Sequence, residues 1–376
     1  MVLGRDMDQV RFLGDHLRGV RDALLSSRRF QLFAAGFPLT RPIARRRAAD
    51  LFDICTGFVH SQVLVACVQL RLFQQLQSEP LTVATLGARA SIAPDAMAAL
   101  LDAAAALRLL ERRGGGRYGL GPLGAAMLGN PGIAAMVEHH AALYADLADP
   151  VALLRGDAAE RRLASYWPYA RGEALTRDAV WPYTALMSAS QPMVAEMVLG
   201  AYSFRRHRCL LDIGGGDGSF LIAVAHAAPK LELQLLDLPE VAAIARDKLS
   251  AADLGARATA IGGNFLTMPL PQGADVISLI RVVHDHNDDV VIDLFTRIRE
   301  ALPQDGALVI GEPMSAVHGG ADSVSAYFAL YLHAMGSGRP RSFAAMQTLL
   351  ARCGFCDVRQ RKTRIPLISS VVVARR

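Results

Sequence analysis

The stretch Cys209-Leu-Leu-Asp-Ile-Gly-Gly-Gly-Asp-Gly-Ser-Phe220 decides which fold this chain adopts. Its apolar start breaks into a run of glycines, and a second apolar run continues from Phe220 to Ala228 before Pro229. Leu231 to Leu236 then has the composition of a strand, and Asp237 follows it. A strand, a glycine turn, a helix and a strand that ends in an acidic residue together predict an α/β fold with a nucleotide-type binding site.

The spacing of the glycines distinguishes between classes of nucleotide-type ligand. A dinucleotide loop has glycines at its first, third and sixth positions, whereas here they fall at Gly214, Gly216 and Gly218, and the sixth position is Ser219. The loop also lacks a Lys or Arg that would help to hold a pyrophosphate. Gly-x-Gly-x-Gly after a strand resembles instead the first motif of S-adenosylmethionine-dependent methyltransferases, in which Asp237 would accept both ribose hydroxyls. The alternative is a glycine turn in another α/β protein, with Asp237 capping the next helix.

Composition bounds the class of protein. The chain has 376 residues, of which 52% are hydrophobic and 20% charged, so it is long enough for two or three domains with a large core. Because no apolar run reaches eighteen residues, we expect no transmembrane helix. The first 21 residues alternate Asp and Arg and lack the apolar core of a signal peptide. Five irregularly spaced cysteines favour reduced thiols and a cytoplasmic location.

The net charge of +5 is spread unevenly. One early segment and one segment before the glycine stretch hold clusters of arginine: Arg28, Arg29, Arg41, Arg45, Arg46 and Arg47, and then Arg205, Arg206 and Arg208. Such clusters can meet the phosphates of nucleic acid or anionic lipid. They can equally be solvated helix faces or subunit contacts. No nucleic-acid-binding signature accompanies them, so we expect no nucleic-acid partner and leave peripheral membrane association open.

Hydrophobic periodicity divides the chain into four predicted segments. Residues 1–45 form a helical arm with a break at Phe37-Pro38, and residues 46–150 form a helical domain with a glycine-tipped hairpin. Residues 151–208 form a helical linker with aromatic residues for a substrate pocket, and residues 209–376 alternate strands with helices. The last segment predicts a doubly wound, Rossmann-like sheet that closes in an antiparallel C-terminal hairpin.

The 46–150 segment resembles a winged helix, which raises the alternative of DNA binding. However, the helix that would read the bases, Asp95 to Leu110, consists mainly of alanine and leucine and offers almost no groups to base edges. We therefore interpret this segment as a dimerisation domain, in which small alanines let helices approach closely, and we expect a homodimer.

The order of motifs resembles the plant-type small-molecule O-methyltransferases over nearly the whole chain. The motifs that carry the resemblance are Leu211-Asp-Ile-Gly-Gly-Gly-Asp-Gly218, Leu235-Leu-Asp-Leu-Pro239, Gly262-Gly-Asn-Phe265, His284-Asp-His286 and Gly311-Glu-Pro313, behind the winged-helix-like front. Within the family, Phe37–Arg47, Leu51–Cys55 and Ala334–Arg339 resemble bacterial members that methylate the tertiary 1-hydroxyl of acyclic carotenoids. The resemblance implies a class I methyltransferase fold, S-adenosyl-L-methionine as cofactor and a hydrophobic small-molecule acceptor.

The resemblance also implies the binding residues. The cofactor would contact Asp212, Gly214, Gly216, Gly218, Asp237, Leu238, Asn264, Phe265 and Arg281. Asn264 replaces the family's Asp, but its carbonyl oxygen can still accept a hydrogen bond from adenine. The acceptor would contact Trp181, Met187, Tyr327, His333 and Met335, in part of the segment that we expect to close over the methyl group. The other aromatic candidates are Trp167, Tyr169 and Tyr183.

The resemblance makes His284 the general base and Glu312 the carboxylate that orients it. The family's Trp is His286 here, its lysine four residues before the base is Ile280, and its second supporting carboxylate is absent near Arg339-Pro-Arg341. An alcohol is a poor nucleophile until it loses its proton, and a histidine can take that proton for about 10²–10⁴ in rate. A histidine that only packs at a strand end is the alternative. We interpret Asp285 and Asp288 as helix caps and expect no metal.

Three hypotheses follow from the sequence. The first is O-methylation of an acyclic carotenoid. The second is methylation of another acceptor, such as a bacteriochlorophyll precursor or an aromatic polyketide. The third is a winged-helix regulator that senses S-adenosylmethionine, against which the alanine-rich helix counts.

Overall fold

The computed structural model describes residues 3–157, 161–166, 176–315 and 321–376. The chain divides into two compact units, which are considered separately. The N-terminal unit contains residues 1–70 and 79–119, and the C-terminal unit contains residues 71–78 and 120–376. The four-segment division predicted from periodicity is finer than this, and its boundaries stay a prediction. Trp167 and Tyr169 lie outside the described residues.

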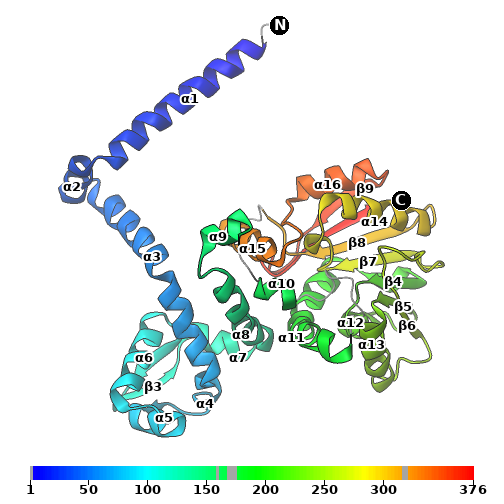
Figure 1. The fold of residues 1–376 in the computed structure, drawn as a ribbon, viewed down its shortest axis with the longest axis horizontal. Coiled ribbons are helices and arrows are strands. Elements are labelled where there is room, and N and C mark those ends of the chain that lie inside the picture. The colour runs from blue at the N-terminus through cyan, green and yellow to red at the C-terminus, as the bar shows by residue number, and fades with distance from the viewer. Residues whose placement is uncertain (1–2, 158–160, 167–175, 316–320) are drawn as a thin grey trace. The chain divides into compact units, whose positions relative to one another are not determined.

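Three helices begin the N-terminal unit: α1 (Leu3–Ser26), α2 (Arg28–Gly36) and α3 (Arg41–Gln69). Ser27 caps α2 by accepting a hydrogen bond from the N–H of Phe30, and the break predicted at Phe37-Pro38 separates α2 from α3. Figure 1 shows α2 at the corner between α1 and α3. By length and composition α3 could cross a membrane, although we expected no such helix from the sequence. Only 17% of its most apolar window is buried.

The rest of the N-terminal unit has the predicted winged-helix order. The elements are β1 (Leu81–Thr82), α5 (Val83–Ala90), α6 (Pro94–Ala106), β2 (Leu110–Arg113) and β3 (Arg117–Leu120), and the strands pair in the order β1-β3-β2. Thr82 caps α5, and α6 buries Met97, Leu101 and Ala104, which recur at helical spacing on one face. The alanine-rich helix therefore packs into its own unit with its apolar face.

Short and long helices lead into the sheet of the C-terminal unit. They are α4 (Leu72–Gln75), α7 (Pro122–Leu128), α8 (Pro131–Asp146), α9 (Pro150–Arg155), α10 (Arg162–Tyr166) and α11 (Arg177–Ala201). We predicted that residues 131–208 are mainly helical, with a long helix from Gln191 to Tyr202. The helix begins earlier, at Arg177, and Pro182 and Pro192 both lie inside it. It packs against α8, α12 (Ser219–Ala227), α13 (Pro239–Ala251) and β10 (Ser370–Arg375).

The sheet has seven strands in the order β6-β5-β4-β7-β8-β10-β9, with only β10 and β9 antiparallel to their neighbours. In chain order the elements are β4 (Cys209–Ile213), α12 (Ser219–Ala227), β5 (Glu232–Asp237), α13 (Pro239–Ala251), β6 (Ala258–Gly262), β7 (Val276–Ile280), α14 (Asp288–Ala301), β8 (Ala307–Glu312), α15 (Ala321–Met335), α16 (Phe343–Arg352), β9 (Cys356–Arg361) and β10 (Ser370–Arg375). This confirms the doubly wound sheet with an antiparallel C-terminal hairpin.

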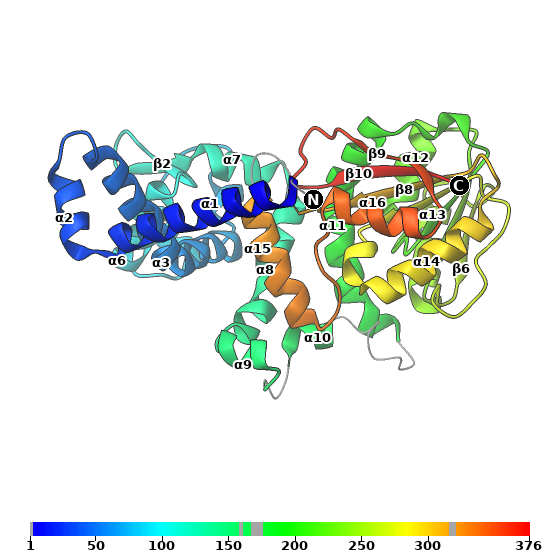
Figure 2. The ribbon, with the colours of Figure 1, turned by 90° about the horizontal axis from the view of Figure 1, so that it is seen from above.

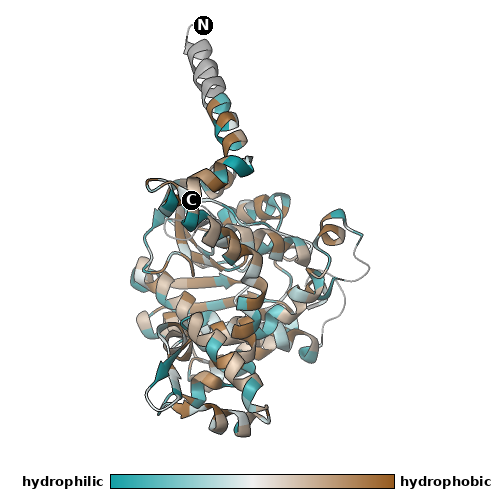
Figure 3. Cartoon of the chain, turned by 90° about the vertical axis from the view of Figure 1, so that its left-hand side faces the viewer, coloured by the Kyte–Doolittle hydropathy of each residue, from teal (hydrophilic) through white to brown (hydrophobic). Residues whose placement is uncertain are grey.

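Helices cover both faces of this sheet. Alternate residues of a strand point to opposite faces, so Leu210 packs with α11, α12 and α13, whereas Leu211 packs with α14 and α16. Figure 1 shows the two helical layers on either side of the strands, and Figure 2 shows α15 beside α8 in the same unit. In Figure 3 the strands are mostly brown, as expected for parallel strands buried on both faces, while the described part of α1 mixes brown and teal.

Candidate active site

A cavity opens where the parallel strands β4, β5 and β7 end. Its wall combines loops after these strands with one face of α11. The lining residues are Tyr183, Thr184, Met187, Ser188, Gln191, Asp212, Gly214, Gly215, Asp217, Asp237, Leu238, Asn264, Phe265, Leu266, Ile280, Arg281, Val282, Asp285 and His286. Ligands of open α/β sheets bind at this edge. The structure thus brings seven of the nine predicted cofactor residues into one wall, together with Met187.

The glycine loop forms part of the cavity wall through Gly214 and Gly215. At both positions a side chain would clash with neighbouring atoms. Gly214 has a φ of 68°, and a Cβ there would lie 2.7 Å from Val282. A Cβ on Gly215 would lie 2.7 Å from Leu235 and 2.8 Å from the Asp212 Oδ2. Gly216 and Gly218 do not line the cavity; Gly216 donates its N–H to Asp237, and Gly218 caps α12 in a left-handed conformation.

Two carboxylates face this loop, the buried Asp212 and the half-buried Asp237. Asp237 accepts hydrogen bonds from the N–H groups of Gly216 at 2.8 Å and of Leu238 at 2.7 Å. Burial raises the pKa of Asp237 to about 6 against the opposing effect of these hydrogen bonds. Burial likewise raises the pKa of Asp212 to about 7, although Ser278 donates to its Oδ1 at 2.5 Å. The second oxygen of Asp212 has no hydrogen-bond partner among the described residues.

Arg281 lies opposite, at the end of β7, with a φ of 57° that is unusual for a residue with a Cβ. Its guanidinium donates to the Ser190 hydroxyl at 2.6 Å, to the carbonyl of Met187 at 2.9 Å and to the side chain of Gln191. These bonds tie the strand end to α11. The buried Nε of Arg281 has no partner in the part of the chain that is described.

Asn264 and Phe265 close another side of the cavity. The Asn264 Oδ1 accepts the N–H of Leu266 at 2.8 Å, so part of its acceptor capacity holds a local turn. The Phe265 ring meets His286 edge-on, with ring centroids 5.6 Å apart. Leu238 lies next to Asp237 in the wall. The predicted contact of Asn264 with adenine therefore depends on the second lone pair of the same oxygen.

Sequence reasoning named Met187 and Tyr183 of α11 but missed Thr184, Ser188 and Gln191 of the same helix, as well as Asp217. Tyr183, Thr184, Met187, Ser188 and Gln191 recur at helical spacing on the face toward the cavity, and this periodicity was the available signal. Asp217 binds the ammonium of Lys248 at 2.6 Å, and that ammonium also donates to Ser188 and Ser219. The cluster joins α11, the glycine loop and α13.

His284 lies in a 3-10 turn, Val283–Asp285, rather than at a strand end. Its Nδ1 forms a very short contact with the Oε2 of Glu312, which ends β8 and is 2% exposed. The Glu312 Oε1 accepts the N–H groups of Val282 and Val283 at 3.0 and 2.7 Å. The structure therefore brings together the two residues predicted as base and orienting carboxylate, and it leaves Nε2 on the far side of the ring.

Asp285 contributes a second carboxylate to His284, which corrects our interpretation of Asp285 as a cap. Its Oδ1 lies 3.1 Å from the His284 Nε2, and Asp285 also lines the cavity. Burial alone would lower the pKa of His284, but the charges of Asp285 and Glu312 raise it to about 9. Burial raises the pKa of Asp285 to about 6 in spite of the neighbouring imidazolium.

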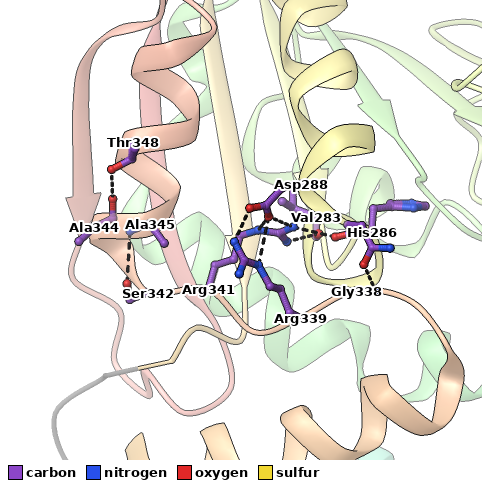
Figure 4. A network of polar contacts seen from close by, with 11 residues as sticks. Val283, His286, Asp288, Gly338, Arg339, Arg341, Ser342, Ala344, Ala345 and Thr348 are labelled. Atoms are coloured by element: carbon purple, nitrogen blue, oxygen red, sulfur yellow. Dashed lines mark hydrogen bonds and ion pairs between the residues drawn. The ribbon is translucent and has the colours of Figure 1, made fainter. Parts of the chain in front are cut away.

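Asp288 was also predicted as a cap, and this interpretation is wrong as well. Asn287 occupies the N-cap position of α14, while Asp288 pairs with Arg339 and with the buried Arg341. Figure 4 shows both arginines converging on this carboxylate. Arg341 further donates to the carbonyls of Val283 and His286, each at 2.7 Å.

The segment before Arg341 packs against the turn that contains His284. Gly338 has a φ of 86°, and a Cβ there would lie 2.1 Å from the His284 carbonyl oxygen. That oxygen accepts the N–H of Arg339 at 2.9 Å. The place where the sequence lacks a second carboxylate thus supports His284 through its backbone, by a glycine and two arginines.

The predicted acceptor residues lie in three different places. Met187 lines the cavity, while Trp181 is 52% exposed and is not in its wall. Tyr327 donates to or accepts from His140 of α8 at 2.9 Å, and its neighbour Phe328 meets the His284 ring edge-on at 5.8 Å between centroids. Tyr327 is therefore one residue away from contact with His284.

The other two predicted acceptor residues lie farther along α15. His333 pairs with the backbone carbonyl of Leu153, and Met335 is buried in a cluster with Leu153 and Leu163. Neither belongs to the wall of the cavity. Their contact with an acceptor stays a prediction.

The unsatisfied atoms of the wall test which ligand fits. Asp212 offers a buried carboxylate oxygen and Arg281 a buried N–H, each without a partner among the described residues. A ligand that carries both an ammonium and a carboxylate satisfies both, and the amino-acid end of S-adenosylmethionine carries these two groups. Asp237, beside the loop, offers acceptors for hydroxyls. The residues present fit this cofactor.

Comparison with known protein families matches most of the chain. The profile of an O-methyltransferase domain matches residues 144–356, and the profile of an O-methyltransferase dimerisation domain matches residues 52–130. A demethylspheroidene O-methyltransferase of Cereibacter sphaeroides is 46% identical over 364 residues, which are 96% of this chain and 95% of the relative. Its counterpart in Rhodobacter capsulatus is 42% identical, over 94% of this chain and 88% of the relative.

Solved structures share the fold. A methyltransferase of calicheamicin biosynthesis in its S-adenosylhomocysteine-bound form matches with a TM-score of 0.74 at 24% identity, over 88% of this chain and 98% of the other. Human N-acetylserotonin methyltransferase in complex with S-adenosylmethionine matches with a TM-score of 0.73 at 24% identity, over 88% of this chain and 97% of the other. With the two matched domains and the relatives above, these likenesses show that the chain belongs to the S-adenosylmethionine-dependent O-methyltransferases that carry an N-terminal dimerisation domain.

Proposed function

We propose that this enzyme methylates the tertiary 1-hydroxyl of an acyclic carotenoid, as in hydroxyneurosporene or demethylspheroidene. The observation that carries the proposal is the His284–Glu312 pair beside the cavity, in a chain 46% identical to a demethylspheroidene O-methyltransferase over nearly its whole length. A tertiary alcohol is hindered and weakly acidic, so it depends on a positioned proton acceptor more than a phenol does.

The cofactor-binding residues follow from the wall of the cavity. S-adenosylmethionine supplies a methyl group on a positively charged sulfur when it is bound. We propose that Asp212 and Arg281 hold its amino-acid end, that Asp237 accepts the ribose hydroxyls, and that Asn264 and Phe265 contact adenine. Gly214 lets backbone approach the ligand, whereas Gly216 and Gly218 shape the loop without lining it. Because the sulfonium is already a good leaving group, the protein contributes mainly position.

His284 is the proposed proton acceptor for the acceptor hydroxyl. Its Nδ1 faces Glu312, so the proton would be taken at Nε2. A pKa of about 9 keeps the imidazole mostly protonated at neutral pH. The base form is therefore the minor species, and its share grows as the pH rises toward 9.

Asp285 is the second candidate for proton acceptor. It lines the cavity, and with a pKa of about 6 it is mostly ionised at neutral pH. Its Oδ1 lies 3.1 Å from the His284 Nε2. A proton taken by the carboxylate can pass to the imidazole only in the fraction of enzyme in which His284 is neutral. Replacing each residue alone distinguishes the two roles, as described below.

A panel of acceptors tests the substrate. Purified enzyme is incubated with S-adenosylmethionine labelled in its methyl group and with a 1-hydroxy acyclic carotenoid, a hydroxylated porphyrin or a phenol, each dispersed in detergent. We expect label on the carotenoid and little on the others. Transfer to the porphyrin or phenol alone would replace the carotenoid by another acceptor class.

The dimerisation domain supports a homodimer. Large apolar side chains on α3 are exposed in the single chain: Leu51 by 63%, Phe52 by 65%, Ile54 by 78% and Phe58 by 69%. Exposed apolar surface of this extent marks an interaction site. We propose that a second copy covers this part of α3, and that the dimer works in the cytoplasm at the face of a membrane that holds the acceptor.

A further inference from the structure

The segment of residues 23–49, which we name the arginine arm, combines positive charge with exposed apolar side chains. It contains six arginines and no Asp or Glu: Arg28, Arg29, Arg41, Arg45, Arg46 and Arg47. All six are exposed. The nearest ion pairs along the chain, Arg18–Asp15 and Arg21–Asp22, lie before the arm. The arm therefore presents its positive charge to whatever lies outside the chain.

The apolar side chains of the arm are exposed among these arginines. The exposed fraction is 67% for Leu32, 60% for Phe33, 79% for Leu39 and 58% for Ile43. On α2 the buried residue is Ala34, so the outward half of this helix carries Arg28, Arg29, Leu32 and Phe33. The Phe33 ring stacks on Phe37, with centroids 5.4 Å apart, which holds the turn between α2 and α3.

The arm lies wholly outside the region that matches the dimerisation domain, which begins at residue 52. A two-fold contact of the arm with itself would bring six positive charges of one subunit against six of the other. Charge thus disfavours the arm's own copy as its cover. It favours a surface that is negative and also accepts apolar side chains.

We propose that the arginine arm docks the enzyme on an anionic lipid bilayer. The arginines contact the lipid phosphates, while Leu32, Phe33, Leu39 and Ile43 enter the boundary between headgroups and acyl chains. Basic residues beside apolar side chains on short helices are typical of such interfacial binding. This inference rests on the proposed action at a membrane, and it names the surface and the charge of the lipid.

Co-sedimentation of the full-length enzyme with vesicles tests the arm. Vesicles of phosphatidylcholine alone are compared with vesicles that contain phosphatidylglycerol, at low and at high salt. We expect binding to the anionic vesicles that weakens at high salt and little binding to the neutral ones. Equal binding to both, or binding to neither, would overturn the proposal.

Two variants and a matched control locate the surface. The triple variant R45Q, R46Q, R47Q should weaken binding on the order of 100-fold at low salt, because each basic residue near the surface contributes about fivefold. The double variant F33S, L39S should also weaken it. The control R205Q, R206Q, R208Q removes the same charge from the other arginine cluster and should bind as the wild type does. A control that loses binding equally would overturn the assignment to the arm.

Two further measurements distinguish membrane docking by the arm from a subunit contact of the arm and from the proposed acceptor specificity. Sedimentation velocity in solution should give the same oligomeric state for wild type and variants; a dimer that falls apart in R45Q, R46Q, R47Q would assign the arm to a second copy instead. Methyl transfer to detergent-dispersed carotenoid should be unchanged in these variants. Vesicle binding without any such transfer would contradict the proposed acceptor but not the docking of the arm. Transfer without vesicle binding would contradict the docking but not the acceptor.

Discussion

His284 lies between two carboxylates, Glu312 at Nδ1 and Asp285 at Nε2. A lone histidine near neutral pKa was what the sequence suggested for a base. Two buried negative charges change this, because they stabilise the imidazolium and raise its pKa to about 9. The acceptor's proton then has two possible receivers, and single substitutions decide between them.

The variant Asp285→Asn should move the pH profile of kcat/KM to lower pH. In the wild type the rising limb follows the loss of the His284 proton toward pH 9, and the charge of Asp285 is one cause of this raised pKa. Removing the charge lowers the pKa, so the neutral base appears at lower pH. Steady-state rates from pH 6 to 10 measure the shift; the exposed His226→Ala should leave the profile in place. Loss of nearly all activity at every pH would identify Asp285 as the base.

Cofactor affinity should fall as the pH drops below about 7. Burial raises the pKa of Asp212 to about 7, so at lower pH this carboxyl is protonated and cannot pair with an ammonium. Each pH unit below the pKa then weakens binding by up to about tenfold. Calorimetry at pH 8 and pH 6, in two buffers of different ionisation enthalpy, should also detect proton release on binding. Asp212→Asn should abolish much of the pH dependence, and an unchanged dependence would exclude this residue.

The sequence alone identified those site residues that stand at fixed positions of a local pattern of strand, glycine turn and strand. Asp212, Gly214 and Asp237 follow from strand, turn and strand, and the structure places all three in the cavity wall. It did not identify Asp285 as a partner of His284, because adjacent residues face each other only when the backbone turns as tightly as it does at Val283–Asp285. Arg341 was missed for a related reason. It donates to backbone carbonyls, and a pattern of side-chain types does not predict hydrogen bonds to the backbone.

At the scale of elements, two side-chain pairs join α15 to α8, one of them buried and the other half-buried. His139 bonds the hydroxyl of Tyr331 and His140 bonds that of Tyr327, both at 2.9 Å. Tyr327 also touches Phe328, which meets the His284 ring. The position of α8 is thereby linked to the environment of the proposed base.

Tyr327→Phe should raise the KM for the acceptor and leave cofactor affinity unchanged. The substitution keeps the ring but removes the bond to His140, so a half-buried imidazole nitrogen loses its partner at a cost of about 1 kcal/mol in stability. Thermal unfolding and acceptor titration measure the two effects. Tyr331→Phe is the matched control, because it removes an equivalent bond one turn away from the Phe328 contact with His284; we expect a similar loss of stability with less change in KM. Equal KM changes in both variants would mean that a general destabilisation of α15, and not the contact of Phe328 with His284, explains the effect.

The elements themselves were largely predictable, and their ends were less so. Alternation of apolar runs with glycine and proline gave the doubly wound sheet and its antiparallel hairpin. The helical character of this region was predicted, but the start of α11 at Arg177 was not. Pro182 and Pro192 lie inside the helix, and its packing against α8 and α12 outweighs two lost hydrogen bonds.

At the scale of the whole molecule, exposed apolar surface is concentrated on α3. The side chains of Ile54 and Phe58 are 78% and 69% exposed in the single chain, beside the start of the matched dimerisation domain. The sequence indicated an association domain through its alanines, but it could not show which face of α3 is left uncovered. That depends on how α6 packs against the C-terminal part of the helix.

Ile54→Glu with Phe58→Glu should convert a dimer into monomers. Two buried carboxylates at a subunit interface cannot both be solvated, so association should weaken by several orders of magnitude. Sedimentation velocity measures the state, and circular dichroism confirms that the chain stays folded, because both side chains are already exposed. Asp53→Asn, at an exposed carboxylate that lies about 100° around α3 from Ile54, serves as the control. A folded double variant that remains a dimer would place the interface elsewhere.

The central claim is that this enzyme transfers a methyl group to a hydroxyl oxygen of an acyclic carotenoid with His284 as proton acceptor. The most direct measurement incubates wild type and His284→Ala with methyl-labelled S-adenosylmethionine and a 1-hydroxy acyclic carotenoid, and identifies the product by NMR. We predict a labelled methyl ether at the tertiary carbon, with turnover about 10²–10⁴ lower in His284→Ala and nearly equal cofactor affinity. No labelled ether from the wild type, or equal turnover in the two proteins, would contradict the account.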